Sequence, residues 1–120
     1  ELKKEISSGV ISLLGVDEFL KKPVSALSMG MKKRLSIACA VADKPKILLM
    51  DEPSAYLDII CKADIHRYMN EHKKQGGSII LVSHDVGDFG VCDEHYVLRS
   101  GILTPFEYND NVDELIKIIG

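Results

Sequence analysis

The sequence predicts an α/β fold in which helices flank a parallel sheet. Residues 47–50 and 79–82 are apolar at every position, which is typical of strands buried on both faces of such a sheet. The segment between them carries apolar residues at helical spacing and ends at Gly76 and Gly77. Strand, helix and strand in this order form a β-α-β unit.

Two helices are expected before the first strand. An opening stripe recurs at helical spacing and is followed by Gly15, a suitable C-cap; the stripe consists of Leu2, Ile6, Val10, Leu13 and Leu14. A connector containing Pro23 leads to the second helix. It extends from Ser28, which is placed to cap the N-terminus, to about Ala42, and Lys44-Pro45 ends it.

Shorter elements are expected after the second strand. Residues 86–92 suggest a short helix, and apolar residues on both sides of 99–101 predict a small hairpin. A last helical stripe contains Val112, Leu115, Ile116 and Ile119. No repeat, low-complexity tract or flexible linker marks a boundary, so residues 1–120 are predicted to form a single domain or a piece of one.

The composition excludes several classes of protein. Asp and Glu number 18 against 15 Lys and Arg, and no long run of one charge gives a footprint for nucleic acid. Cys39, Cys61 and Cys92 lie far apart, which argues against a zinc site or a disulfide framework and predicts free thiols. No apolar stretch approaches the roughly 20 residues that cross a bilayer.

An acidic pair, Asp51-Glu52, follows the first predicted strand directly and precedes Pro53. Ligand sites of open α/β sheets lie at the carboxyl ends of the strands. Two carboxylates there suggest a metal ligand and a base, and four apolar residues followed by an acid is the Walker B pattern. A strand end followed by a helix-capping aspartate explains the same residues equally well.

Ser83-His84-Asp85 ends the second predicted strand, and we therefore expect it at the same edge of the sheet. Three consecutive residues cannot converge as a catalytic triad. Ser83 or Asp85 could simply cap the next helix, and a single histidine makes a weak metal site.

Residues 27–31, Leu-Ser-Met-Gly-Met, stand at the start of the second predicted helix. Free backbone N–H groups and the helix dipole favour an anion at this position, and Gly30 permits close approach of the backbone. An ordinary helix N-terminus is the alternative interpretation. The following Lys32-Lys33-Arg34 is typical of a solvated face rather than a nucleic-acid patch.

Taken together and in order, these motifs resemble the nucleotide-binding domains of ABC transporters over residues 24–103. LSMGMKKRLSIA is similar to the family signature, ILLMDEP to its Walker B motif with the adjoining glutamate, SAYLD to its D-loop and SHD to its switch-histidine loop. VCDEHYVLRSGIL is similar to the closing hairpin of the family. The resemblance implies the C-terminal portion of an ABC ATPase domain.

The fold implied by the resemblance is an incomplete P-loop NTPase-type parallel sheet flanked by helices. Residues 1–45 would form part of the helical subdomain, 46–104 the catalytic core, and 105–120 a C-terminal helix. The cofactors implied are ATP and Mg²⁺.

The resemblance also implies roles for single residues. Asp51 would hold Mg²⁺, Glu52 would orient or deprotonate the attacking water, and His84 would contact the γ-phosphate. Asp58 would join two ATP sites across a dimer. The signature residues would bind the ATP of the opposite subunit; these are Ser28, Met29, Gly30 and Met31.

The implied partners are a second ABC ATPase domain in a head-to-tail dimer and a transmembrane permease at the cytoplasmic face of the membrane, with no nucleic acid expected. Met29 and Met31 depart from the most frequent signature and resemble drug, antibiotic and bacteriocin-type exporters. The function expected is ATP hydrolysis coupled to transport, with export as the direction.

No G-x-x-x-x-G-K-[ST] sequence occurs in the chain, so the loop that cradles the β- and γ-phosphates is missing from it. We therefore expect negligible ATP binding and hydrolysis by this chain alone, and an apolar sheet face exposed. Two other functions remain open: a soluble ABC ATPase acting on ribosomes or DNA, and a non-catalytic dimerisation module.

Overall fold

The chain folds into two compact units, which divide after Asp85, in a computed structural model that describes residues 9–120. The first unit contains these elements: α2 (Val10–Leu13), η1 (Val16–Phe19), η2 (Val24–Ala26), α3 (Met29–Val41), β1 (Ile47–Asp51), α4 (Ile59–Lys74) and β2 (Ser78–Val82). The second contains α5 (Val86–Phe89), β3 (His95–Arg99), β4 (Ile102–Phe106) and α6 (Val112–Ile119). The α/β class predicted from the sequence is confirmed.

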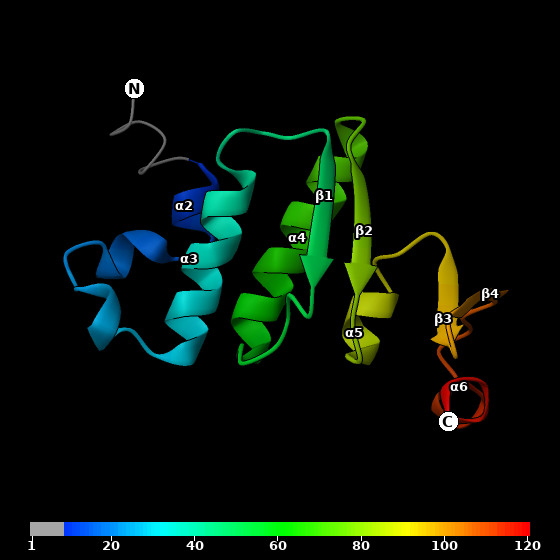
Figure 1. Cartoon of the computed structure of the whole chain (residues 1–120). Helices are drawn as coiled ribbons and strands as arrows, with labels where there is room; N and C mark the ends of the chain where they lie inside the picture. Colours follow the sequence, from blue (N-terminus) through cyan, green and yellow to red (C-terminus); the bar gives the residue numbers. More distant parts are fainter. Residues whose placement is uncertain (1–8) are drawn as a thin grey trace. The chain divides into compact units, whose positions relative to one another are not determined.

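The helical segment before the sheet packs around η1, which contacts both α2 and α3 (Figure 1). Leu2 and Ile6, the first two residues of the predicted opening stripe, lie outside the described residues. Gly15 follows α2 with φ 63°, a left-handed conformation that suits glycine at a helix end. The predicted connector holds two 3₁₀ turns, and Val16 and Phe19 of η1 are buried in the core.

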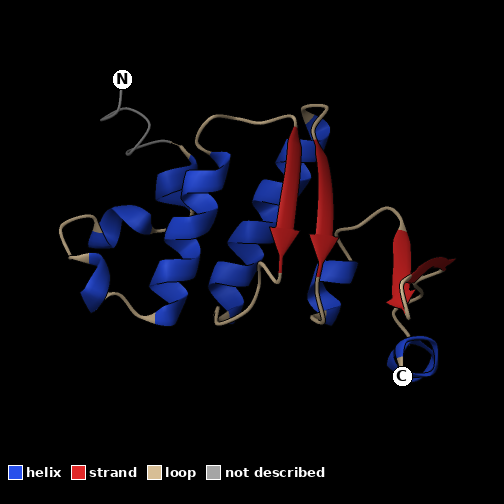
Figure 2. Cartoon of the chain, viewed as in Figure 1, coloured by secondary structure: helices blue, strands red, loops and turns tan. Residues whose placement is uncertain are grey.

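The β-α-β unit is formed as predicted. β1 and β2 pair in parallel, with Leu49 opposite Ile80 in the register, and Figure 2 shows both arrows pointing the same way. α4 connects them and contacts β2. Gly76, with φ 84°, and Gly77 turn the chain from α4 into β2.

The expectation that both strands are buried on both faces is wrong. Leu48 and Met50 of β1 are buried, whereas Leu49 is 75 % exposed. The exposed face of the pair is apolar and consists of Ile47, Leu49, Ile80 and Val82. Among the described residues the sheet therefore has one covered face, and the expected exposure of an apolar face is confirmed.

The second unit is built on the predicted hairpin. β3 and β4 are antiparallel, and Ser100 and Gly101 between them both have positive φ, as a tight hairpin turn requires. Asn111 caps the N-terminus of α6, and its side chain accepts hydrogen bonds from the N–H groups of Asp113 and Glu114. Leu115 is its buried residue.

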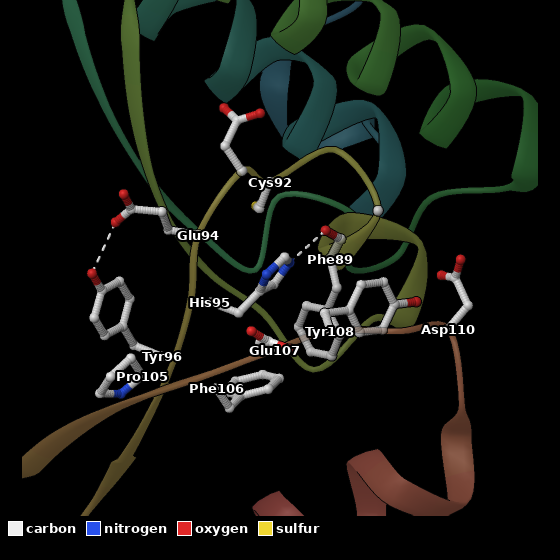
Figure 3. A pocket seen from close by; sticks show the side chains of 12 residues that line it. Phe89, Cys92, Glu94, His95, Tyr96, Pro105, Phe106, Glu107, Tyr108 and Asp110 are labelled. Carbon is white, nitrogen blue, oxygen red and sulfur yellow. Dashed lines mark hydrogen bonds between the residues drawn. The ribbon is translucent and has the colours of Figure 1, made fainter.

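Half-buried aromatic rings gather beside an open hollow of about 620 Å³ in this second unit (Figure 3). Phe89 and Tyr108 meet edge to face, with ring centroids 5.8 Å apart. His95 Nε2 donates a hydrogen bond to the carbonyl of Phe89 at 2.8 Å, which fixes the ring. None of the site residues predicted from the sequence lines this hollow.

Candidate nucleotide site

Glu52 and His84 lie together at the carboxyl ends of neighbouring strands. The Glu52 carboxylate accepts a hydrogen bond from the backbone N–H of His84 at 3.3 Å and also contacts Nδ1 of its imidazole. The His84 side chain is 88 % exposed, so its position depends on these polar contacts rather than on packing. The two predicted catalytic residues are thus brought into direct contact.

The backbone of Glu52 explains how its side chain reaches the histidine. Its N–H donates to the carbonyl of Val82 at 2.7 Å, which extends the β1–β2 pairing by one residue. At Glu52 the chain then turns into a left-handed conformation, with φ 48°. Non-glycine residues held in this region cost roughly 1–3 kcal/mol and cluster at functional sites.

Asp51, the predicted magnesium ligand, ends β1 and is exposed. Lys33 of α3 donates a hydrogen bond to the backbone carbonyl of Asp51 at 3.1 Å. This bond does not use the Asp51 carboxylate. No group of three or more His, Cys, Asp or Glu side chains suited to a metal occurs among residues 9–120. A single exposed carboxylate fits Mg²⁺, which keeps several waters and takes its other ligands from nucleotide phosphates.

The start of α3 provides donors for an anion. The Ser28 hydroxyl accepts a hydrogen bond from Met31 N–H at 3.2 Å, and as a hydroxyl it retains its own proton for donation. The first intrahelical bond runs from Lys32 N–H to the Ser28 carbonyl. The N–H groups of Met29 and Gly30 precede it and have no carbonyl to bind within the helix.

These signature residues share one hollow with the D-loop. It has a volume of about 410 Å³ and is lined by Ser28, Met29, Gly30, Met31, Arg34, Tyr56, Leu57, Asp58 and Cys61. All five residues predicted to bind nucleotide are in this set. At Gly30 an added Cβ would lie 2.9 Å from the Tyr56 carbonyl oxygen, so only glycine fits there without displacing the backbone.

Asp58 lines the hollow and also caps α4, because its carboxylate accepts a hydrogen bond from Cys61 N–H at 2.8 Å. That hydrogen bond holds the pKa of Asp58 below its usual value. Burial raises the pKa of the Cys61 thiol, so this cysteine is a weak nucleophile beside the hollow.

Sequence reasoning missed two basic residues that contribute to the signature hollow and to the end of β1. Arg34 lines the hollow and supplies a positive charge, and its guanidinium is held by the carbonyl of Leu14 and by the Phe19 ring. Lys33 reaches the end of β1. Both belong to the Lys-Lys-Arg run, which the sequence predicts to be a solvated face. Their spacing of one helical turn from Gly30 is the one signal that could have placed them beside the signature residues.

The sequence was compared with known proteins. Residues 3–55 match the family model described as ABC transporter. An uncharacterized ABC transporter ATP-binding protein of Bacillus subtilis, YybJ, is 40 % identical over 98 residues, which cover 81 % of this chain and 45 % of that protein. The chain is thus similar to ABC transporter ATP-binding proteins.

Two further proteins are also similar to the chain. The energy-coupling factor transporter ATP-binding protein EcfA of Methanocaldococcus jannaschii is 33 % identical, over 98 % of this chain and 43 % of its own length. A solved archaeal ribosome recycling factor, in complex with a ribosomal stalk protein, has a TM-score of 0.76 and 26 % identity over 95 % of this chain. The chain spans less than half the length of these two curated relatives.

Proposed function

We propose that this chain supplies the catalytic carboxylates, the switch histidine and the signature of an ATP-hydrolysing ABC domain. The contact between Glu52 and His84 at adjacent strand ends carries the proposal. A base that accepts a proton from water must lie beside the group that senses the phosphate receiving the attack. Similarity to ABC transporter ATP-binding proteins supports ATP as the nucleotide.

In the proposed reaction each residue has one task. Mg²⁺, when bound with ATP, supplies charge neutralisation on the phosphates, and Asp51 would hold it. Glu52 accepts the proton of the attacking water, and His84 hydrogen-bonds the γ-phosphate oxygens as their charge develops.

The signature hollow is proposed to act on a second nucleotide. Ser28 Oγ and the free N–H groups of Met29 and Gly30 would bind the γ-phosphate of ATP carried by an opposite subunit, with Met31 and Asp58 beside it. This assigns the chain to a head-to-tail dimer. Arg34 in the same hollow adds a charge suited to phosphate.

A phosphate cradle has to be supplied to this chain, since its sequence contains no P-loop motif. The test mixes the chain with a segment of an ABC ATPase that carries the P-loop. ATP turnover is expected from the mixture and from neither part alone. A mixture that forms a complex, binds ATP and remains without turnover would contradict the proposal.

We further propose that a transmembrane permease docks, at the cytoplasmic face of the membrane, on residues 1–45, which the resemblance assigns to the helical subdomain. No helix among residues 9–120 is long and apolar enough to span a bilayer. Met29 and Met31 favour export as the direction. Co-purification with a permease encoded beside this gene tests this part.

A second candidate is a soluble ABC ATPase that acts on ribosomes. It is favoured by the likeness of this chain to the archaeal ribosome recycling factor. Sedimentation with ribosomes in the presence of ATP would support it, and association with a permease would exclude it.

A further inference from the structure

The switch loop of residues 83–85 is held by polar contacts of three kinds among those described. Glu52 holds His84 from the end of β1. The Ser83 hydroxyl accepts a hydrogen bond from Asp85 N–H at 2.9 Å and closes the turn. Lys62 forms an ion pair with the Asp85 carboxylate across 23 residues of sequence. Of the three, the Lys62 contact joins the loop to α4.

Lys62 is also hydrogen-bonded to Asp58, the last residue of the D-loop. Its backbone N–H donates to the carbonyl of Asp58 at 3.0 Å, in the first turn of α4. Asp58 lines the signature hollow. An uninterrupted chain of contacts therefore leads from the signature hollow through Asp58, Lys62 and Asp85 to His84 and its partner Glu52.

The helix itself does not favour a lysine at this position. A cation in the first turn opposes the helix dipole, and that turn contains no acidic residue; the Asp58 carboxylate just before it is hydrogen-bonded to Cys61 N–H. The Asp85 carboxylate, which comes from another element, supplies the negative charge. Both side chains are about one-third exposed, at 32 % and 30 %, so the pair is partly shielded from water.

We infer that Lys62 is a positioning residue that couples the D-loop to the switch histidine. By holding Asp85 against α4, it fixes where His84 stands relative to Glu52, and it passes a displacement of Asp58 to the catalytic pair. The expected effect of Lys62 on ATP turnover rests on the proposed function. Its effect on the position of His84 rests only on contacts within the described residues.

The kinetic test compares three variants in the P-loop-complemented ATPase: Lys62→Met, Lys62→Arg and the double exchange Lys62→Asp with Asp85→Lys. Lys62→Met is expected to lower kcat about 10- to 100-fold, because a small misplacement of catalytic groups has this effect. The KM for ATP should change less than about twofold, since the residue does not touch nucleotide. Lys62→Arg and the double exchange should each restore most of kcat.

Wild-type kcat in Lys62→Met, or an equal loss in all three variants, would overturn the inference. Circular dichroism of each variant identifies a general folding defect, and Lys62→Arg keeps the test informative if Lys62→Met does not fold. A second arm uses nuclear Overhauser effects between Glu52 and His84 in the 120-residue chain without nucleotide. They should be lost in Lys62→Met and kept in Lys62→Arg. If the Overhauser effects are retained in both variants, the positioning role is contradicted. An inactive complemented ATPase would refute only the proposed function and would leave this second test intact.

Discussion

The carboxylate of Glu52 contacts both the backbone N–H and Nδ1 of His84, although 32 residues separate them in the chain. The contact arises because β1 and β2 are parallel neighbours, so their carboxyl ends lie side by side. Glu52 leaves β1 in a left-handed turn, and His84 stands in the loop after β2. The proposed base and the proposed phosphate sensor are thereby placed within hydrogen-bond reach.

Gly30→Ala tests the close approach of the signature helix to the D-loop. Alanine favours a helix over glycine by up to about 1 kcal/mol. The added Cβ would lie 2.9 Å from the Tyr56 carbonyl, and such overpacking costs roughly 1–3 kcal/mol. We expect a net loss of stability in urea unfolding. The control is Gly90→Ala, whose Cβ meets its nearest atom at 3.7 Å; a stabilised Gly30→Ala would refute the contact.

Leu48→Ala and Leu49→Ala, measured by the same method, test which face of β1 is covered. Leu48 is 4 % exposed, and its truncation should cost about 2–5 kcal/mol. Leu49 is 75 % exposed, and its truncation should stay within about 0.5 kcal/mol. Equal losses at the two positions would show that both faces are buried in solution.

Asp58→Ala tests the cap of α4 and gives a pH dependence with a defined sign. Because the Cys61 hydrogen bond lowers the pKa of Asp58 in the folded state, ionised Asp58 stabilises that state above its usual pKa of 3.8. The contribution is lost as the pH falls through the folded-state pKa. The urea midpoint of wild type should therefore be higher than that of Asp58→Ala at pH 7, and the difference should shrink as the pH falls below 3.8. A constant difference over this range would contradict the assignment.

The order of the strands, helices and motifs could be predicted from the sequence, because each depends on local patterns. The Ser28 cap, the β-α-β unit and the hairpin are confirmed. The missing P-loop predicted an exposed apolar sheet face, but the apolar run of β1 does not indicate which of its faces that is, since such a run is the same whether one or both faces find a partner.

The contacts within the candidate site could be predicted only in part. Parallel strand ends indicated that Asp51-Glu52 and Ser83-His84-Asp85 would lie near each other. The Lys62–Asp85 pair and the approach of Tyr56 to Gly30 join residues whose spacing carries no periodic signal. The left-handed backbone of Glu52 and Tyr56 is equally invisible, because neither residue type favours it.

The chain alone is expected to bind ATP with a dissociation constant no tighter than on the order of 1 mM, because it lacks the backbone cradle for the β- and γ-phosphates. Isothermal titration calorimetry with Mg-ATP measures this. A micromolar dissociation constant would contradict this expectation. It would show that the Arg34 charge and the backbone N–H donors at the start of α3 are sufficient to bind ATP.

The most direct test of the central claim is ATP turnover by the P-loop-complemented chain carrying Glu52→Gln, which keeps the shape of the side chain and removes the base. Glu71→Gln is the matched control, because Glu71 lies on α4, is 55 % exposed and pairs only with its neighbour Lys74 among the contacts described for it. Loss of a general base should lower kcat by at least about 100-fold in Glu52→Gln, with Glu71→Gln at the wild-type rate. An unchanged kcat in Glu52→Gln would contradict the claim that this chain supplies the catalytic base.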